Sequence, residues 1–233
     1  MLKKIIVTGG DGRFAKELRK FKSKYNFFFK SKTQLNILSE KSINNNLRKF
    51  RPDAILHLAS LSRPMSLHEK DINKSININV IGTANLVKAC NKKKIKIIYL
   101  STSYLYPGKK GNYKETDPLL PWNNYGWSKL GAESVVQMYK NSLIIRACMT
   151  EKPFVHKKAF TNVKCNFIFH DEFIKILLKV LKFKGILNIG GKSQTIFQFA
   201  KKYKKNVKRK VSNGELPSKI YMSLDKVNRL LEK

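Results

Sequence analysis

The chain has 233 residues, of which 42% are hydrophobic and 27% charged, and its formal net charge at pH 7 is +33. This length suggests one domain with a small appended lobe, and the apolar content excludes a disordered chain. No apolar run approaches the roughly 18 residues that span a bilayer, and the apolar start is too short for a signal peptide. We therefore expect a cytoplasmic protein.

The basic residues are mostly lysines spread along the chain, whereas arginine is the side chain suited to bidentate reading of phosphates and bases. We interpret the charge as a compositional bias and expect no specific nucleic-acid partner; polyanion binding, including at the basic run 201–210, is the alternative. Cys90, Cys148 and Cys165 show no metal-like spacing and are expected to be buried free thiols. The histidines suggest no metal site either.

In chain order, apolar runs that predict strands alternate with patterns that predict helices. Strands are predicted at residues 3–8, 25–29, 54–59, 95–100, 142–146 and 185–189. Helices are predicted at residues 14–22, 38–50, 76–90, 125–139, 173–181 and 197–204, and a long loop at 106–121. This order predicts an α/β fold, a doubly wound Rossmann-type parallel sheet with a small C-terminal substrate lobe.

A glycine motif separates the first predicted strand from the first predicted helix. Its residues are Gly9-Gly10-Asp11-Gly12-Arg13-Phe14-Ala15. Gly9 allows a tight turn, Gly12 lets the backbone approach a pyrophosphate, and Ala15 permits close packing of helix on sheet. The motif predicts dinucleotide binding, with a merely structural turn as the alternative.

The residues after the second strand bear on which dinucleotide binds. An NAD site usually carries an acidic residue there for the ribose 2′-hydroxyl, but this chain has Lys30-Ser31-Lys32. Cations in place of a carboxylate favour a 2′-phosphate, so we expect NADP(H) over NAD(H).

Tyr125 and Lys129 are four residues apart on a predicted helix, so both side chains lie on one face. A nearby ammonium lowers the pKa of a tyrosine from about 10, which makes the phenol a usable proton donor or acceptor. Thr102 follows the strand predicted at 95–100, where a hydroxyl can bind a substrate carbonyl oxygen; the alternative is a strand-end cap. These three are the candidate catalytic residues.

The chain resembles the extended short-chain dehydrogenase/reductase family, which acts mostly on nucleotide sugars. Motifs similar to the family's occur in the same order along most of the chain. They are Thr8-Gly9-Gly10-Asp11-Gly12-Arg13-Phe14-Ala15, His57-Leu58-Ala59-Ser60, Asn79-Val80-Ile81-Gly82-Thr83, Leu100-Ser101-Thr102-Ser103, Glu115-Thr116-Asp117-Pro118, Tyr125-Gly126-Trp127-Ser128-Lys129 and Leu187-Asn188-Ile189-Gly190-Gly191. The resemblance implies a cofactor site of Gly9, Asp11, Gly12, Arg13, Phe14, Lys32, Asn36, Ala59, Ser60, Asn79, Tyr125 and Lys129. It also implies a dinucleotide-binding domain at 1–147 and a reduced substrate lobe at 148–233, interleaved with a last strand at 185–190.

Within that family, the dTDP-4-dehydrorhamnose reductase branch is the most similar, because Thr102 is followed by Tyr104-Leu105-Tyr106 and residues 32–37 and 221–225 match its pattern. Ser103 stands where those reductases usually carry aspartate, and Ser103-Tyr104 replaces the Asp-Glu pair of the sugar dehydratases. The resemblance implies reduction of a 4-keto nucleotide sugar. The alternatives are an epimerase that retains NAD and a non-catalytic cofactor-binding regulatory protein. A homodimer is considered for the protein in each case.

Locations or contacts are also expected for one histidine and two arginines. His57 lies in a predicted strand and is expected to be packed. Arg63 and Arg146 could reach a diphosphate, with a surface or loop role as the alternative.

Overall fold

The computed structural model describes residues 2–232, and the chain divides into two compact units. The first unit comprises the chain up to Ser101 together with Asn123–Ile145 and Leu181–Ile186. The second unit comprises Thr102–Trp122, Arg146–Val180 and the chain from Leu187 onward. Each unit therefore draws on several separate stretches of sequence.

A six-stranded parallel sheet with the order β10-β5-β4-β3-β1-β2 forms the centre of the fold. Its strands are β1 (Lys4–Thr8), β2 (Asn26–Lys30), β3 (Ala54–His57), β4 (Lys96–Thr102), β5 (Ser142–Ala147) and β10 (Gly185–Ile189). The strands are apolar along their length because a parallel sheet is covered on both faces. The six predicted strands and the doubly wound fold are confirmed.

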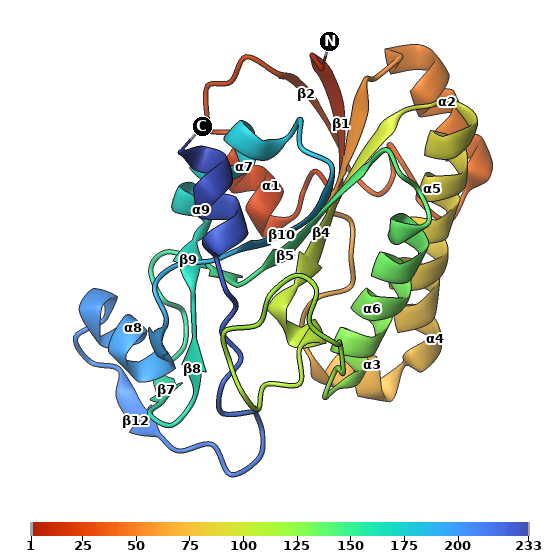
Figure 1. The fold of residues 1–233 in the computed structure, drawn as a ribbon. Coiled ribbons are helices and arrows are strands. Elements are labelled where there is room, and N and C mark those ends of the chain that lie inside the picture. Colours follow the sequence, from red (N-terminus) through yellow and green to blue (C-terminus); the bar gives the residue numbers. More distant parts are fainter. Residues whose placement is uncertain (1, 233) are drawn as a thin grey trace. The chain divides into compact units, whose positions relative to one another are not determined.

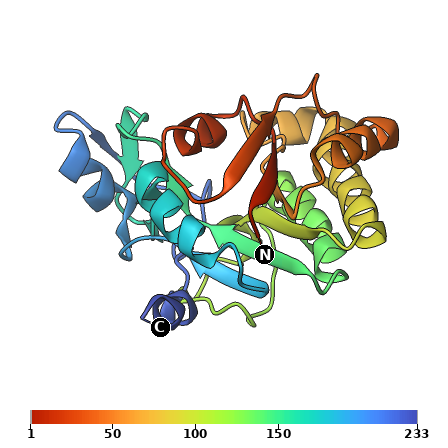
Figure 2. The same cartoon turned by 90° about the horizontal axis from the view of Figure 1, so that it is seen from above.

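Helices cover both faces of the sheet within the first unit. α1 (Arg13–Leu18) lies on one face, and α2 (Glu40–Phe50), α5 (Gly82–Lys92) and α6 (Asn124–Gln137) lie side by side on the other (Figures 1 and 2). The side chains between the sheet and these three helices form a buried apolar core that includes Ile6, Ile55, Leu86, Ile97, Ala132 and Val136.

The predicted helix at 76–90 is in fact two elements, a π-helical segment η1 (Ile76–Ile81) and then α5. Two short helices, α3 (Ser66–Lys70) and α4 (Ile72–Ser75), precede it and were not predicted. The wider π turn changes which side chains face inward. Asn79 is 2% exposed, whereas Ile76 and Ile81 are 43% and 44% exposed.

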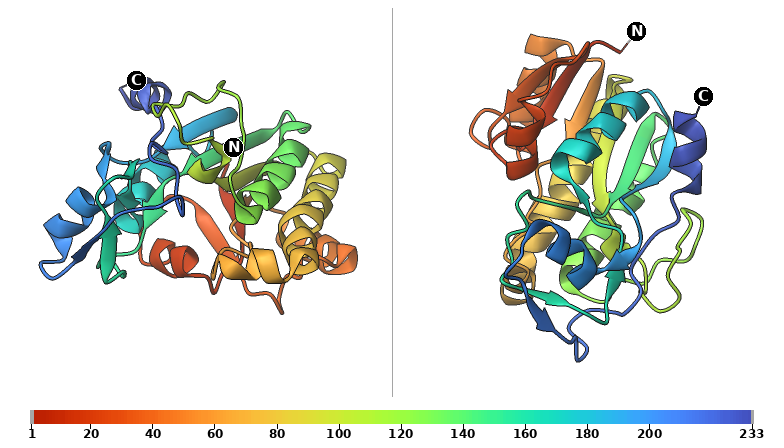
Figure 3. Two further views of the ribbon diagram at one scale, coloured as in Figure 1. Left: turned by 90° about the horizontal axis from the view of Figure 1, so that it is seen from below. Right: turned by 90° about the vertical axis from the view of Figure 1, so that its left-hand side faces the viewer.

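The second unit contains short strands and three helices. The strands are β6 (Met149–Thr150), β7 (Lys158–Phe160), β8 (Lys164–Cys165), β9 (Ile168–Phe169), β11 (Gln194–Thr195) and β12 (Lys208–Lys210). The helices are α7 (His170–Val180), α8 (Ile196–Tyr203) and α9 (Asp225–Leu231), besides the 3-10 turn η2 (Ser103–Leu105). α8 packs beside the β7–β12 pair (Figure 3). An aromatic core that includes Phe154, Phe169 and Phe199 lies between these elements.

The unit's basic run, residues 201–210, was predicted as a solvated helix end and its loop. Residues 201–203 do end α8 and a loop follows, but Lys208–Lys210 form β12, which pairs in parallel with β7 and leaves all three side chains exposed. The pairing uses backbone groups, so these basic side chains place no constraint on it.

The three cysteines are buried free thiols, as expected. Across residues 2–232, none of the helices combines the length and the apolar character that a membrane crossing requires. Within the same range, no group of three or more His, Cys, Asp and Glu side chains is arranged to hold a metal ion.

Candidate active site

The glycine loop leaves the sheet where the chain order reverses, because β2 lies on one side of β1 and β3 on the other. Ligands of open α/β sheets bind outside the carboxyl ends of the strands at such a point. Gly9 has φ +65°, and a Cβ there would lie 2.8 Å from the backbone of Ala59, which follows β3. Gly9 is therefore needed both for its left-handed backbone and for the close approach of two strand ends.

The rest of the loop is held by backbone bonds and its outer part is exposed. The Gly10 N–H donates to the Lys30 carbonyl at 2.8 Å and the Gly12 N–H to the Gly9 carbonyl at 2.9 Å. Asp11, Gly12 and Arg13 are exposed, whereas Phe14 is 7% exposed and packs into the core. The outer part of the loop, residues 11–13, is therefore exposed to solvent.

Lys30, the last residue of β2, and Lys32, which follows the strand, differ in their exposure to solvent. The Lys30 ammonium lies 3.7 Å from the centre of the Phe50 ring, and the pKa of Lys30 is lowered by burial and then by Lys49. Lys32 is exposed. The Asn36 Oδ1 accepts from the Leu38 N–H at 3.0 Å, so its side chain closes a local turn. Lys32 is thus the freer of the two cations expected near a 2′-phosphate.

His57 at the end of β3 is packed, as expected, and its hydrogen bonds define its tautomer. The Thr83 hydroxyl donates to the Asn79 carbonyl at 2.6 Å, so it accepts from His57 Nε2 at 3.0 Å. His57 Nδ1 then accepts from the Thr8 hydroxyl at 2.8 Å. Burial, followed by the charge of Lys129, lowers the pKa of His57 to about 3, so the imidazole is neutral and structural.

Asn79 joins three parts of the first unit. Its Oδ1 accepts from the Ser60 hydroxyl at 3.0 Å and from the Leu61 N–H at 2.8 Å. Its Nδ2 donates to the Leu61 carbonyl at 3.0 Å and to the Ser128 hydroxyl at 2.8 Å. The segment after β3, the π turn and helix α6 are thereby held together beside the Tyr125/Lys129 pair.

Helix α6 carries Tyr125 and Lys129 on one face. Asn123 caps the N-terminus of this helix, since its side chain accepts from the Gly126 N–H at 2.8 Å. The Lys129 ammonium donates to the Leu100 carbonyl on β4 at 2.8 Å and lies 4.1 Å from the centre of the Tyr99 ring. Lys129 is 3% exposed, and burial lowers its pKa to about 7. Burial therefore makes this ammonium easier to deprotonate than that of an exposed lysine.

Thr102 was predicted to follow a strand at 95–100, but β4 extends two residues further and Thr102 is its last residue. It belongs to the second unit, whereas the other predicted site residues belong to the first. Its hydroxyl accepts from the Tyr104 N–H at 3.3 Å at the start of η2. This is the strand-end cap given above as the alternative. A single acceptor bond leaves the hydroxyl proton available to a carbonyl oxygen, so capping and substrate binding are compatible.

Two buried residues beside the pair were not singled out from the sequence. Glu133 is 0% exposed and lies four residues after Lys129, a spacing that could have been used to find it. His68 on α3 is 0% exposed, its ring lies 5.1 Å from that of Tyr125, and its Nδ1 is 2.7 Å from the Ser75 hydroxyl. The sequence of the short helix α3 shows no periodic pattern that would have placed His68 beside Tyr125.

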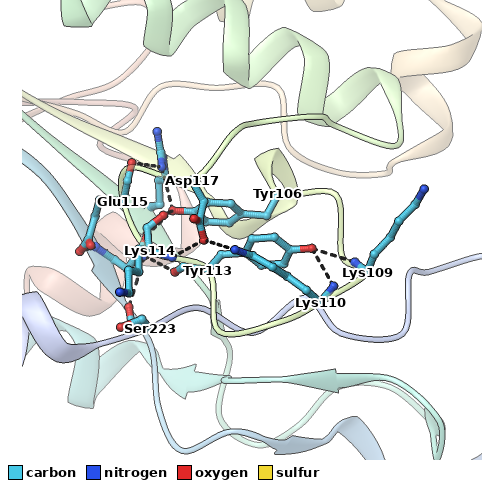
Figure 4. Close-up of polar contacts among 10 residues, drawn as sticks. Tyr106, Lys109, Lys110, Tyr113, Lys114, Glu115, Asp117 and Ser223 are labelled. Carbon is cyan, nitrogen blue, oxygen red and sulfur yellow. Dashed lines mark hydrogen bonds and ion pairs between the residues drawn. The ribbon is translucent and has the colours of Figure 1, made fainter.

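The second unit has its own buried polar cluster, drawn in Figure 4 around Tyr106 and Glu115. Arg146 is 2% exposed and donates to the Tyr106 hydroxyl at 2.7 Å and to the Glu115 carbonyl at 3.0 Å. Tyr106 donates in turn to Asn188 Oδ1 at 2.8 Å. The surface or loop role considered for Arg146 is wrong, because the arginine is enclosed by this cluster.

The same cluster explains two of the sequence motifs. The Glu115 carboxylate accepts from the Asn188 N–H at 2.9 Å, so residues 115–118 and 187–191 meet in the second unit. Asp117 pairs with the Lys110 ammonium at 3.0 Å and accepts from the Lys114 N–H at 2.9 Å (Figure 4). These contacts order the loop rather than present it to a ligand.

Known proteins resemble the chain in sequence. It is 32% identical over 147 residues to the spore coat polysaccharide biosynthesis protein SpsK of Bacillus subtilis, covering 61% of this chain and 52% of that protein. It is 24% identical over 191 residues to the dTDP-4-dehydrorhamnose reductase of Aggregatibacter actinomycetemcomitans, covering 80% and 60%. It is also 32% identical over 144 residues to methionine adenosyltransferase 2 subunit beta of Danio rerio, covering 56% and 42%. The chain thus spans about half the length of these relatives.

Solved structures share the fold. The dTDP-4-dehydrorhamnose reductase of Bacillus anthracis, in complex with NADP, matches with a TM-score of 0.88 at 21% identity, over 98% of this chain and 92% of that one. The UDP-glucose 4-epimerase of Thermus thermophilus, in complex with NAD, matches with a TM-score of 0.79 at 15% identity, over 97% and 92%.

The family model for the RmlD substrate binding domain matches residues 3–160, which contain the glycine loop, Thr102 and the Tyr125/Lys129 pair. The match extends over more than half of the chain. The chain therefore belongs to the RmlD substrate binding domain family.

Proposed function

We propose that the protein is an NAD(P)-dependent oxidoreductase that reduces a 4-keto nucleotide sugar. The observation that carries the proposal is the Tyr125/Lys129 pair on α6, with the lysine buried and bonded to the end of β4. A buried ammonium one turn from a phenol is costly for a purely structural role, and perturbed ionisable groups concentrate at functional sites. The match to a dTDP-4-dehydrorhamnose reductase supports this substrate class.

The first unit fits a dinucleotide. Gly9 leaves room that a Cβ would fill, and the loop that follows it is exposed at the sheet's switch point. We assign cofactor contacts to Gly9, Asp11, Gly12, Arg13, Phe14, Lys32, Asn36, Ala59, Ser60, Asn79, Tyr125 and Lys129. A nicotinamide bound there would supply the hydride, and the exposed Lys32 favours NADP(H).

The chain's own residues handle the proton. Tyr125 donates its phenolic proton to the oxygen of the substrate carbonyl as that oxygen gains charge. Lys129, in its ammonium form, stabilises the phenolate left behind and restrains the cofactor ribose. We assign Thr102 the role of a hydrogen-bond donor to a substrate carbonyl oxygen, from its place at the end of β4.

We assign the sugar and nucleotide to residues 148–233 and the cofactor to residues 1–147. A nucleotide-sugar substrate would gain from the net charge of +33. A cytoplasmic location and a homodimer stay predictions.

Substitution Tyr125→Phe tests the proposal. It removes the proton donor and keeps the ring, so turnover of a panel of dTDP- and UDP-4-keto sugars should fall by about 10²–10⁴-fold. NADPH and NADH affinity, measured by nucleotide fluorescence, should stay within about twofold. Wild-type turnover in the variant would contradict the proposal.

The same assays separate the two alternatives. An epimerase would copurify with NAD and consume none, whereas a reductase oxidises one NADPH for each product. The likeness to methionine adenosyltransferase 2 subunit beta favours a non-catalytic subunit as the second candidate. That role predicts cofactor binding without turnover of any 4-keto sugar, and no effect of Tyr125→Phe.

A further inference from the structure

Helix α6 carries a third ionisable side chain in register with the pair. Tyr125, Lys129 and Glu133 follow one another at intervals of four residues, so they lie on one face of the helix. Exposure decreases along this face: Tyr125 is partly buried, Lys129 is 3% exposed and Glu133 is 0% exposed. A carboxyl group with no exposed surface is rare unless it is paired or hydrogen-bonded.

Strand β4 holds the two charged groups through consecutive residues. The Leu100 carbonyl accepts from the Lys129 ammonium at 2.8 Å, and the Ser101 hydroxyl donates to Glu133 Oε2 at 2.6 Å. Gln137 donates to the other carboxylate oxygen at 3.2 Å. The carboxyl group is therefore held in place by two hydrogen-bond donors, one helical turn from the ammonium.

Two other ionisable groups described beside Lys129, His57 and Tyr99, supply no negative charge. His57 on β3 is neutral, because burial lowers its pKa to about 3. The pKa of Tyr99 on β4 is raised well above its ordinary value by burial, so that phenol is neutral too. Burial lowers the pKa of Lys129 to about 7, and Glu133 is the group that acts in the opposite direction.

We propose that Glu133 is a positioning residue: its fixed carboxylate keeps the buried Lys129 in the ammonium form, and through Lys129 it acts on Tyr125. The catalytic role of the pair rests on the function proposed above, but the effect of Glu133 on Lys129 does not. Removal of the carboxylate charge should leave the lysine neutral over more of the pH range. The ammonium form would then be lost at a lower pH.

Substitution Glu133→Gln tests the coupling without substrate. It keeps the side-chain size and an oxygen that can accept from Ser101, and it removes the charge. The NH2 group that replaces the other oxygen can donate to Gln137 once the Gln137 amide turns its oxygen toward it. The pKa of Lys129 is read from its ¹³Cε signal in lysine-labelled full-length protein, assigned by its absence in Lys129→Met. We expect that pKa to fall by about one unit or more in Glu133→Gln. An unchanged pKa would overturn the proposal.

Two further variants complete the measurement. Glu40→Gln removes an exposed carboxylate that pairs with Lys88, and the Lys129 signal should not move. An equal shift in Glu40→Gln would also overturn the proposal, because the effect would then be general. If Glu133→Gln does not fold by circular dichroism, Glu133→Asp withdraws the charge by one methylene and should move the pKa in the same direction by less. No shift in that folded variant would contradict the coupling.

The pH profile then connects the coupling to the reaction. If ammonium Lys129 is required for reduction, the alkaline limb of kcat/KM should move to lower pH by the same amount as the Lys129 pKa. A shifted NMR titration in a protein without turnover would reject the proposed function and keep the coupling. A shifted titration with an unshifted alkaline limb would overturn the action on Tyr125.

Discussion

Each of the two units buries a cation, and the surroundings of the two cations differ. Arg146 in the second unit donates to the Tyr106 hydroxyl and the Glu115 carbonyl, inside a cluster that also engages Asn188. Lys129 in the first unit donates to one strand carbonyl, faces an aromatic ring and has a pKa lowered to about 7 by burial. An arginine stays charged under all ordinary conditions, whereas a lysine in this setting can exchange its proton. Burial of charge therefore supports structure in the second unit, whereas in the first it lowers the pKa of a lysine to which we assign a role in proton transfer.

The largest effect is expected from Arg146→Met. Removing the guanidinium leaves the Tyr106 hydroxyl and the Glu115 carbonyl without their buried donor, which should lower the free energy of unfolding by about 3–5 kcal/mol. Urea denaturation followed by circular dichroism measures the change. The control is Arg229→Met on the exposed face of α9, which should stay within about 0.5 kcal/mol of wild type. Similar values for the two variants would remove the structural role given to Arg146.

A pH-dependent effect is expected from Lys129→Met. Burial lowers the pKa of Lys129 to about 7 in the folded protein, against about 10.4 in an unfolded chain. Between these values the unfolded state holds a proton that the folded state has released, so this lysine makes folding stability rise with pH. The melting temperature of wild type minus that of the variant should therefore increase by about 3 °C or more between pH 7 and pH 9.5.

Lys92→Met at the exposed end of α5 serves as the control for that experiment, since no burial perturbs an exposed lysine. Its melting temperature should follow the wild type at both pH values. Parallel curves for wild type and Lys129→Met would show that Lys129 titrates like a surface lysine, and the contrast with Arg146 would then disappear.

The smallest effect is expected from Lys32→Ala, which extends the comparison to an exposed cation. A solvent-exposed charge contributes about 1 kcal/mol or less, so NADPH affinity should fall about fivefold at low salt while NADH affinity stays unchanged. Nucleotide fluorescence titration measures both constants. Lys92→Ala should alter neither constant, and an equal loss for both nucleotides in Lys32→Ala would reject its assignment to a 2′-phosphate.

Much of the first unit could be predicted because its signals are local. Residues 185–189 were predicted as a strand and β10 has those bounds, β1 and β5 differ from prediction by one residue at one end, and β2 is shifted by one residue at both ends. The glycine loop and the spacing of Tyr125 and Lys129 are likewise short-range patterns. The short helices α3 and α4 escaped prediction because one turn of helix has too few residues to show a period.

The site's surroundings were harder to predict, and the π turn shows why. The pattern at 76–90 predicted one continuous helix, yet its first part is the π turn η1, in which Asn79 is buried while Ile76 and Ile81 are exposed. The four hydrogen bonds of Asn79, to Ser60, Leu61 and Ser128, offset the burial of its amide. These partners lie in segments distant along the chain, and sequence periodicity gives no information about which distant segments come into contact.

By itself, the sequence determined the alternation of strands and helices, the place of the glycine loop and the spacing of the Tyr125/Lys129 pair, because each depends on neighbours within a few residues. Only the tertiary structure decided that Lys129 and Glu133 are buried, that His57 is neutral and that Arg146 is enclosed. Burial and pKa depend on groups that folding brings together from distant parts of the chain, such as Ser101 and Glu133, 32 residues apart. A charged side chain in a sequence therefore reveals its role only when its desolvation and its partners are known.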